Sequence, residues 1–138
     1  MNRKYLPTFS ELIDRLSICT LKSIFIPQNK SAYQKEIDDI KHDINAIIGE
    51  KDVKLSAEMI YASMVVMLSN RYIWENESKC RTGNDQSNEL LKMTHSINGV
   101  RNTAKNVISR ELGERVDLKI DCLAAELKSD FQNWDIFK

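Results

Sequence analysis

Residues 90–110 carry four basic side chains and no acidic one, in a chain whose 20 basic and 20 acidic side chains balance. Within this stretch, Asn98, Arg101, Asn102 and Lys105 recur at intervals of three and four residues. On a helix they form one stripe of hydrogen-bond donors and cations. Arginine binds phosphate through its bidentate fork and lysine binds it as a point charge. The stripe therefore predicts an anion-binding site, and it does not indicate a particular reaction.

A second polar stripe is predicted near the start of the chain. Thr8 and Glu11 have the spacing of a capping box, which predicts a helix over about residues 9–26. Glu11, Asp14 and Lys22 lie on one side of that helix, so that carboxylates and an ammonium group can converge on one ligand. The alternative is a solvated face with one ion pair to a neighbouring helix.

The third stripe contains an aromatic residue. Asn70, Trp74, Glu77 and Arg81 follow one another at intervals of four, three and four residues. A tryptophan beside an amide and a cation can stack on a base or a sugar ring. It can equally be an anchor between helices whose indole has one hydrogen-bond partner.

Each of these three helices has a polar stripe beside its apolar seam. Burying a polar or charged side chain without a partner costs several kcal/mol, so the stripes must face one another, a ligand or water. If these stripes paired only with one another, some cations would stay unpaired, because the expected pocket residues include two acidic and four basic side chains. Alternatively, Arg101 and Lys105 pair with the acidic residues Glu36, Asp38, Asp39 and Asp43. The expected pocket is lined by Asp14, Lys22, Asn70, Trp74, Glu77, Arg81, Asn98, Arg101 and Lys105.

The hydrophobic periodicity predicts helices throughout and no strand. A second helix is expected between a capping box at Ser31 and a stop at Gly49, a third from Ser56, a fourth ending at Gly113, and a fifth over about residues 114–134. The third is apolar nearly all round, which predicts a buried central helix. The resulting fold is an all-α bundle of five helices in a single domain, residues 1–138. The expected core comprises Ile37, Ile40, Ile44, Met64, Val65, Leu68, Ile97, Val100 and Ala104.

Composition excludes several classes of function. The balanced charge argues against general nucleic-acid binding, and no run of about 18 apolar residues predicts a membrane helix. Three widely spaced cysteines and the lack of a signal peptide predict a reduced, cytoplasmic protein. The apolar C-terminal tail, with Phe131 and Trp134, predicts docking on the bundle or contact in a homo-oligomer.

Three blocks of the sequence carry a resemblance to a known family. They are the run ELIDRLSICTLK at residues 11–22, the pattern NxxxWxxExxxR at residues 70–81 and the pattern NxxRxxxKxxI at residues 98–108. Together they resemble a family of small, uncharacterised, all-helical proteins found in polysaccharide-biosynthesis loci and in phages. The resemblance covers about residues 10–113, and the chain departs from it at Ser109, where the family favours Asn. It implies a helical fold and, for a phage-type member, sequestration of a host nucleotide signal.

The main functional prediction is binding of a phosphorylated small molecule, such as a nucleotide, a cyclic nucleotide signal or a nucleotide sugar, without a reaction or a cofactor. The alternative from another class is a magnesium-dependent nucleotide pyrophosphohydrolase with Glu11, Asp14 and Glu77 as Mg²⁺ ligands. Within the first predicted helix, Glu11 and Asp14 are the only pair with the ExxD spacing that such enzymes use, and the second carboxylate pair that they use is not evident. A protein-interaction module is the third possibility.

Overall fold

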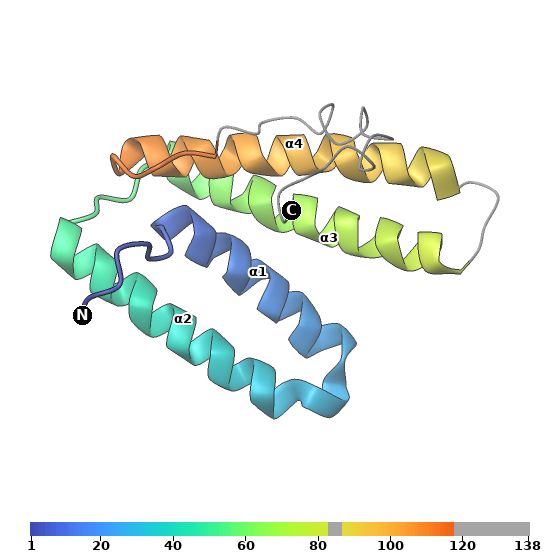
Figure 1. The fold of residues 1–138 in the computed structure, drawn as a ribbon, viewed down its shortest axis with the longest axis horizontal. Helices are drawn as coiled ribbons and strands as arrows, with labels where there is room; N and C mark the ends of the chain where they lie inside the picture. Colours follow the sequence, from blue (N-terminus) through green and yellow to red (C-terminus); the bar gives the residue numbers. More distant parts are fainter. Residues whose placement is uncertain (83–86, 118–138) are drawn as a thin grey trace, which may run out of the picture.

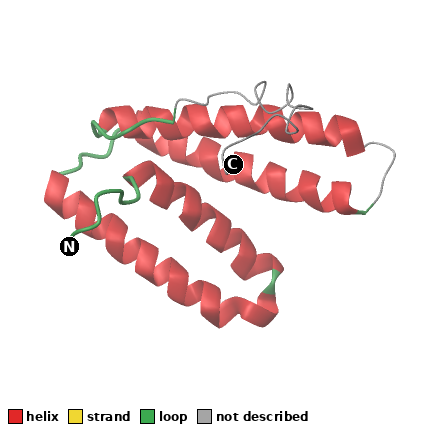
Figure 2. Cartoon of the chain, in the orientation of Figure 1, coloured by secondary structure: helices red, strands yellow, loops and turns green. Residues whose placement is uncertain are grey.

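The computed structural model describes residues 1–82 and 87–117. Over these ranges the chain forms four α-helices and no strand (Figures 1 and 2). They are α1 (Phe9–Phe25), α2 (Lys30–Lys51), α3 (Ala57–Arg81) and α4 (Ser87–Glu111), with a short 3₁₀ turn, η1 (Pro27–Asn29), between α1 and α2. The predicted all-α class is confirmed. None of the described helices is long and apolar enough to cross a membrane.

Local hydrogen bonds explain where three of the helices begin or end. The capping box at α1 is confirmed, because Thr8 accepts from the amide of Glu11 at 3.2 Å and its own amide donates to the Glu11 carboxylate at 2.9 Å. Ser56 caps α3 by accepting from the amide of Met59. After α4, Gly113 adopts a left-handed conformation with φ of 64°, as predicted for a helix stop.

Both predicted ends of α2 are wrong. The helix begins directly from the η1 turn, so Ser31 already lies inside it and caps nothing. Gly49 also lies inside the helix, with no atom within 4 Å of the position of a Cβ. An exposed helical glycine costs about 1 kcal/mol relative to alanine, which is too little to end the helix. The left-handed residue that ends α2 is Asp52, with φ of 48°.

The helices are arranged as two hairpins, α1–α2 and α3–α4 (Figure 1). α1 contacts each of the other three helices, whereas α2 packs mainly on α1. One apolar cluster joins α1, α3 and α4 and contains Phe9, Met59, Ala62, Val66, Ala104 and Ile108. A second cluster joins α1 and α2 around Leu12, Cys19 and Ile40. α1 therefore lies between α2 and the α3–α4 hairpin.

The predicted core is correct in part. Ile40 and Ala104 are buried, and Ile37, Ile44, Val65 and Ile97 are half-buried. Met64, Leu68 and Val100 are exposed, by 59%, 67% and 48%, so their assignment to the core was wrong. α1 and α4 cover one side of α3, while α2 packs on α1 instead. The buried central position predicted for α3 is therefore not confirmed.

The segment after α4 connects the two ends of the described chain. Residues 114–117 are not helical, so the predicted fifth helix does not begin at residue 114, and the rest of that prediction lies outside the described residues. The Glu114 carboxylate accepts from the amide of Phe9 at 3.2 Å, at the start of α1. The Asn106 side chain bonds the backbone of Asp117 as both donor and acceptor. These contacts hold residues 114–117 against α1 and α4.

Candidate functional site

Asn70 is the centre of a group of polar side chains between α1, α3 and α4. Its side chain is 4% exposed and makes three hydrogen bonds. The amide nitrogen donates to Asp14 at 2.7 Å and to Ser17 at 2.5 Å, and the amide oxygen accepts from Arg101 at 2.9 Å. Lys105 joins through Asp14, with Nζ 3.4 Å from the carboxylate. We call these five residues the polar cluster.

The polar cluster contains more positive than negative charge. Asp14 and Lys105 have side chains that are each 15% exposed, so their interaction is only partly screened by water. Arg101 bonds the neutral amide of Asn70, and its Nε is buried with no hydrogen-bond partner among the described residues. The Asn98 Oδ1, one turn away on α4, is buried in the same condition. The polar cluster thus contains two cations and one carboxylate, which pairs with Lys105.

The other predicted site residues lie elsewhere. The Lys22 ammonium lies over the Tyr33 ring of α2, 5.9 Å from its centroid. Trp74 stacks on Phe25 at the end of α1, with ring centroids 6.0 Å apart. Glu77 and Arg81, in the last turns of α3, are exposed. The structure therefore gathers four of the nine predicted residues, Asp14, Asn70, Arg101 and Lys105, into the polar cluster.

The predicted pairing of α4 cations with the acidic residues of α2 is wrong. Glu36 bonds Arg15 at 2.7 Å, and this hydrogen bond holds the pKa of Glu36 below its ordinary value of 4.5. Asp39 pairs with Lys35 within α2. Burial raises the pKa of the neighbouring Cys19 thiol, as expected for a core cysteine.

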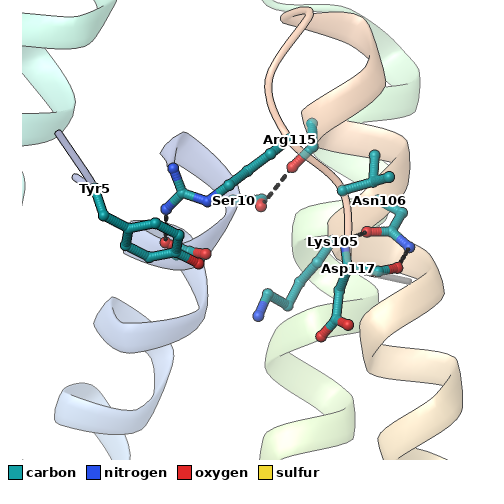
Figure 3. A pocket seen from close by; sticks show the side chains of 9 residues that line it. Tyr5, Ser10, Lys105, Asn106, Arg115 and Asp117 are labelled. Atoms are coloured by element: carbon teal, nitrogen blue, oxygen red, sulfur yellow. Dashed lines mark hydrogen bonds and ion pairs between the residues drawn. The ribbon is translucent and has the colours of Figure 1, made fainter. Parts of the chain in front are cut away.

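A cavity of about 370 Å³ adjoins the polar cluster through Lys105. Its walls come from the N-terminal residues, the first turn of α1, the last turns of α4 and the segment after α4 (Figure 3). It is lined by Tyr5, Ser10, Glu11, Lys105, Asn106, Ser109, Arg115, Val116 and Asp117. We call it the N-terminal cavity.

Arg115 organises one wall of the N-terminal cavity. It donates to Glu11 at 3.0 Å and to the backbone oxygen of Leu6, and its guanidinium lies 3.8 Å from the centroid of the Tyr5 ring. Figure 3 shows this group opposite the α4 side chains. Ser10 and Ser109 meet across the helices, with their hydroxyl oxygens 2.7 Å apart.

Of the residues that line the cavity, the sequence analysis identified Glu11 and Lys105 as candidate site residues but not Ser10, Ser109 or Arg115. Ser109 follows Lys105 at four residues and continues the α4 stripe by one turn, so its position was a usable signal. Arg115 gave none, because it was assigned to a helix that does not include it.

Two of the three residues proposed as Mg²⁺ ligands are engaged in other contacts, and the third is exposed. Glu11 bonds the amide of Thr8 and Arg115, Asp14 bonds Asn70, and Glu77 is exposed. Within residues 1–82 and 87–117, no group of three or more histidine, cysteine or acidic side chains could hold a metal ion. The described residues thus do not assemble the alternative metal site.

Comparisons with known proteins found no matching family model, no matching curated protein and no matching solved structure. The fold and the site together define an all-α helical bundle with a partly buried, positively charged cluster between three helices. Its function must be argued from that geometry.

Proposed function

We propose that this protein binds a phosphorylated small molecule, such as a nucleotide, a cyclic nucleotide signal or a nucleotide sugar, at the polar cluster. The observation that carries the proposal is the excess positive charge there. Arg101 and Lys105 approach α1 and α3 from one face of α4, where Lys105 pairs with Asp14 and Arg101 bonds the uncharged Asn70 side chain. An anion would neutralise the remaining charge.

The hydrogen bonds of the cluster favour an oxygen-rich anion. The buried Nε of Arg101 has no acceptor among the residues that the structure describes, and leaving such a donor unsatisfied costs about 1–3 kcal/mol. The Lys105–Asp14 distance of 3.4 Å is longer than the roughly 2.7–2.9 Å of a strong charge-assisted bond. Lys105 can therefore turn to a phosphate oxygen at small cost, and Arg101 gains the acceptor that it lacks.

For the organic part of the ligand we propose Trp74, which follows Asn70 by one turn of α3 but lies outside the polar cluster. Its side chain is half-buried and stacked on Phe25, and a base can stack on such a ring. The proposed role is binding alone, without a chemical reaction. We extend the proposal to sequestration of a nucleotide signal in the cytoplasm, the role that the family resemblance implies.

Calorimetric titration of nucleotides, cyclic dinucleotides and nucleotide sugars, with and without Mg²⁺, tests this function. Arg101→Gln should weaken binding at least tenfold. Arg110→Gln, which removes an exposed charge from the same helix, is the matched control and should leave it unchanged. Thermal unfolding shows whether each variant folds. If no compound binds, or if Arg101→Gln binds normally, the proposal fails, and turnover that requires Mg²⁺ would support the hydrolase instead.

We also propose that the protein forms a homo-oligomer through the exposed side of α3. Ile60, Tyr61, Met64 and Leu68 are between 48% and 67% exposed and lie within three turns. Such a patch is typical of interaction surfaces. Sedimentation velocity should show a smaller species for Leu68→Glu than for the parent chain, and an identical species for both would contradict this arrangement.

A further inference from the structure

We infer that the N-terminal cavity is the phosphate-binding part of the ligand site and that it takes a phosphate monoester between Lys105 and Arg115. The inference rests on the proposed function, because it concerns the same ligand. It adds three residues to the site, Ser10, Ser109 and Arg115, none of which belongs to the polar cluster.

Two ion pairs lie side by side along α1 at this cavity. Arg115 pairs with Glu11 at 3.0 Å, and Lys105 pairs with Asp14 at 3.4 Å. Because Glu11 and Asp14 are three residues apart, their side chains neighbour each other on one face of the helix. The two cations therefore reach the cavity from different walls, Lys105 from α4 and Arg115 from the segment after it (Figure 3).

The Arg115–Glu11 pair is weak enough to be exchanged for a ligand, whereas the Lys105–Asp14 pair is more buried, with side chains each 15% exposed. The side chains of Arg115 and Glu11 are 37% and 36% exposed, and exposed ion pairs are worth about 0–1 kcal/mol. A phosphate monoester carries close to two negative charges at neutral pH and offers three acceptor oxygens. It can thus bind both cations at once, which neither carboxylate does.

Two hydroxyl groups also line the cavity, those of Ser10 and Ser109. Thr8, Ser10 and Ser109 form a chain of hydroxyl groups, with oxygen separations of 3.2 Å and 2.7 Å. Either oxygen of each contact can be the donor, so the chain can reorient to direct one hydroxyl proton at a phosphate oxygen.

The size of the cavity narrows the class of ligand. Its volume of about 370 Å³ is near the lower end of the roughly 300–1,000 Å³ found for small-molecule pockets. It suits a phosphorylated sugar or a mononucleotide better than a dinucleotide. The Tyr5 ring at the rim is already held by Arg115 and limits the space further.

The test is calorimetric titration with ribose 5-phosphate and AMP, with ribose and adenosine as uncharged counterparts and inorganic phosphate as a third probe. Arg115→Gln should raise the Kd for the phosphate esters at least tenfold, and Arg110→Gln should leave it within twofold. The uncharged counterparts should not bind. Equal affinity of Arg115→Gln and the parent chain would overturn the inference.

A second variant distinguishes loss of the binding site from loss of the folded structure. Glu11→Gln removes the carboxylate that competes for Arg115, and glutamine can still complete the capping box with Thr8. Phosphate esters should then bind several-fold more tightly, a gain that damage to the fold would not produce. Unchanged or weaker binding would count against the cavity.

The two proposals fail in different patterns. If Arg101→Gln weakens binding and Arg115→Gln does not, the polar cluster binds the ligand and the cavity does not. If only Arg115→Gln weakens it, the cavity is the site and the role given to Arg101 is wrong. If no phosphate ester binds, both proposals are wrong.

Discussion

Replacing Asn70 with alanine should destabilise the fold more than any other polar-to-alanine change on α3. The side chain makes two hydrogen bonds to charged groups, Asp14 and Arg101, and one to Ser17. Hydrogen bonds to charged groups contribute about 1.5–3 kcal/mol each and a neutral one about 1 kcal/mol. Because the three bonds share one amide and water can enter the space, we expect a loss of about 3–5 kcal/mol in the free energy of unfolding, a large part of the total for a small domain.

Asn76→Ala is the matched control for this prediction. Asn76 lies on the same helix and is 3% exposed, and its side-chain nitrogen has no hydrogen-bond partner among the described residues. Its replacement should cost under about 1 kcal/mol, because it removes an unsatisfied buried donor. Urea unfolding followed by circular dichroism and tryptophan fluorescence measures both variants. Equal losses would show that burial of an amide, rather than its bonds to α1 and α4, accounts for the stability.

Three further changes test the fold and its ion pairs. Thr8→Ala should lower the free energy of unfolding by about 0.5–2 kcal/mol by removing the cap of α1, while Ser31→Ala, inside α2, should not lower it measurably in the same urea titration. Because Arg15 holds the pKa of Glu36 below 4.5, their stabilisation is full at neutral pH and is lost as the pH falls through the folded-state pKa. The stability difference between the parent and Glu36→Gln, at most about 1 kcal/mol at pH 7 for an exposed pair, should therefore shrink as the pH falls below 4.5 and disappear once Glu36 is protonated in the folded state. Ile108→Ala removes a fully buried side chain and should cost about 2–5 kcal/mol by chemical denaturation, so a loss below about 1 kcal/mol would contradict its place in the core.

Local signals predicted the helices well where the hydrogen bonds that define them are also local. Thr8, Ser56 and Gly113 mark helix ends because their caps involve residues only a few positions away. Ser31 and Gly49 gave wrong predictions for the ends of α2, because a cap also requires the backbone to leave the helical conformation at that residue. Here the helix begins at the η1 turn and ends at Asp52. Periodicity likewise identified the apolar faces, but an all-round apolar helix does not reveal which side its neighbours cover. The exposed side of α3 follows from the packing of α2 on α1, which depends on tertiary contacts.

The predicted site residues are correct only where α1, α3 and α4 contact one another, which is over about one turn of each helix. Asp14, Asn70 and Arg101 come together where α1 contacts both α3 and α4. The same stripes continue to Lys22 and Trp74, but those side chains find aromatic partners near the other end of α1. Spacing along a helix shows which residues share a face. It does not show how far along that face the next helix stays in contact.

The bond between the Phe9 amide and the Glu114 carboxylate has a consequence for the order of folding. The two residues are 105 positions apart, whereas each hairpin is closed by contacts between helices adjacent in sequence. Long loops cost more entropy to close and their contacts form slowly, so we expect the hairpins to form first and this junction to form last. During synthesis the first turn of α1 must wait for the residues that follow α4. Of the four described helices, α1 is synthesised first and would thus be completed last, and slow protection of the Phe9 amide in pulsed hydrogen exchange would report that step.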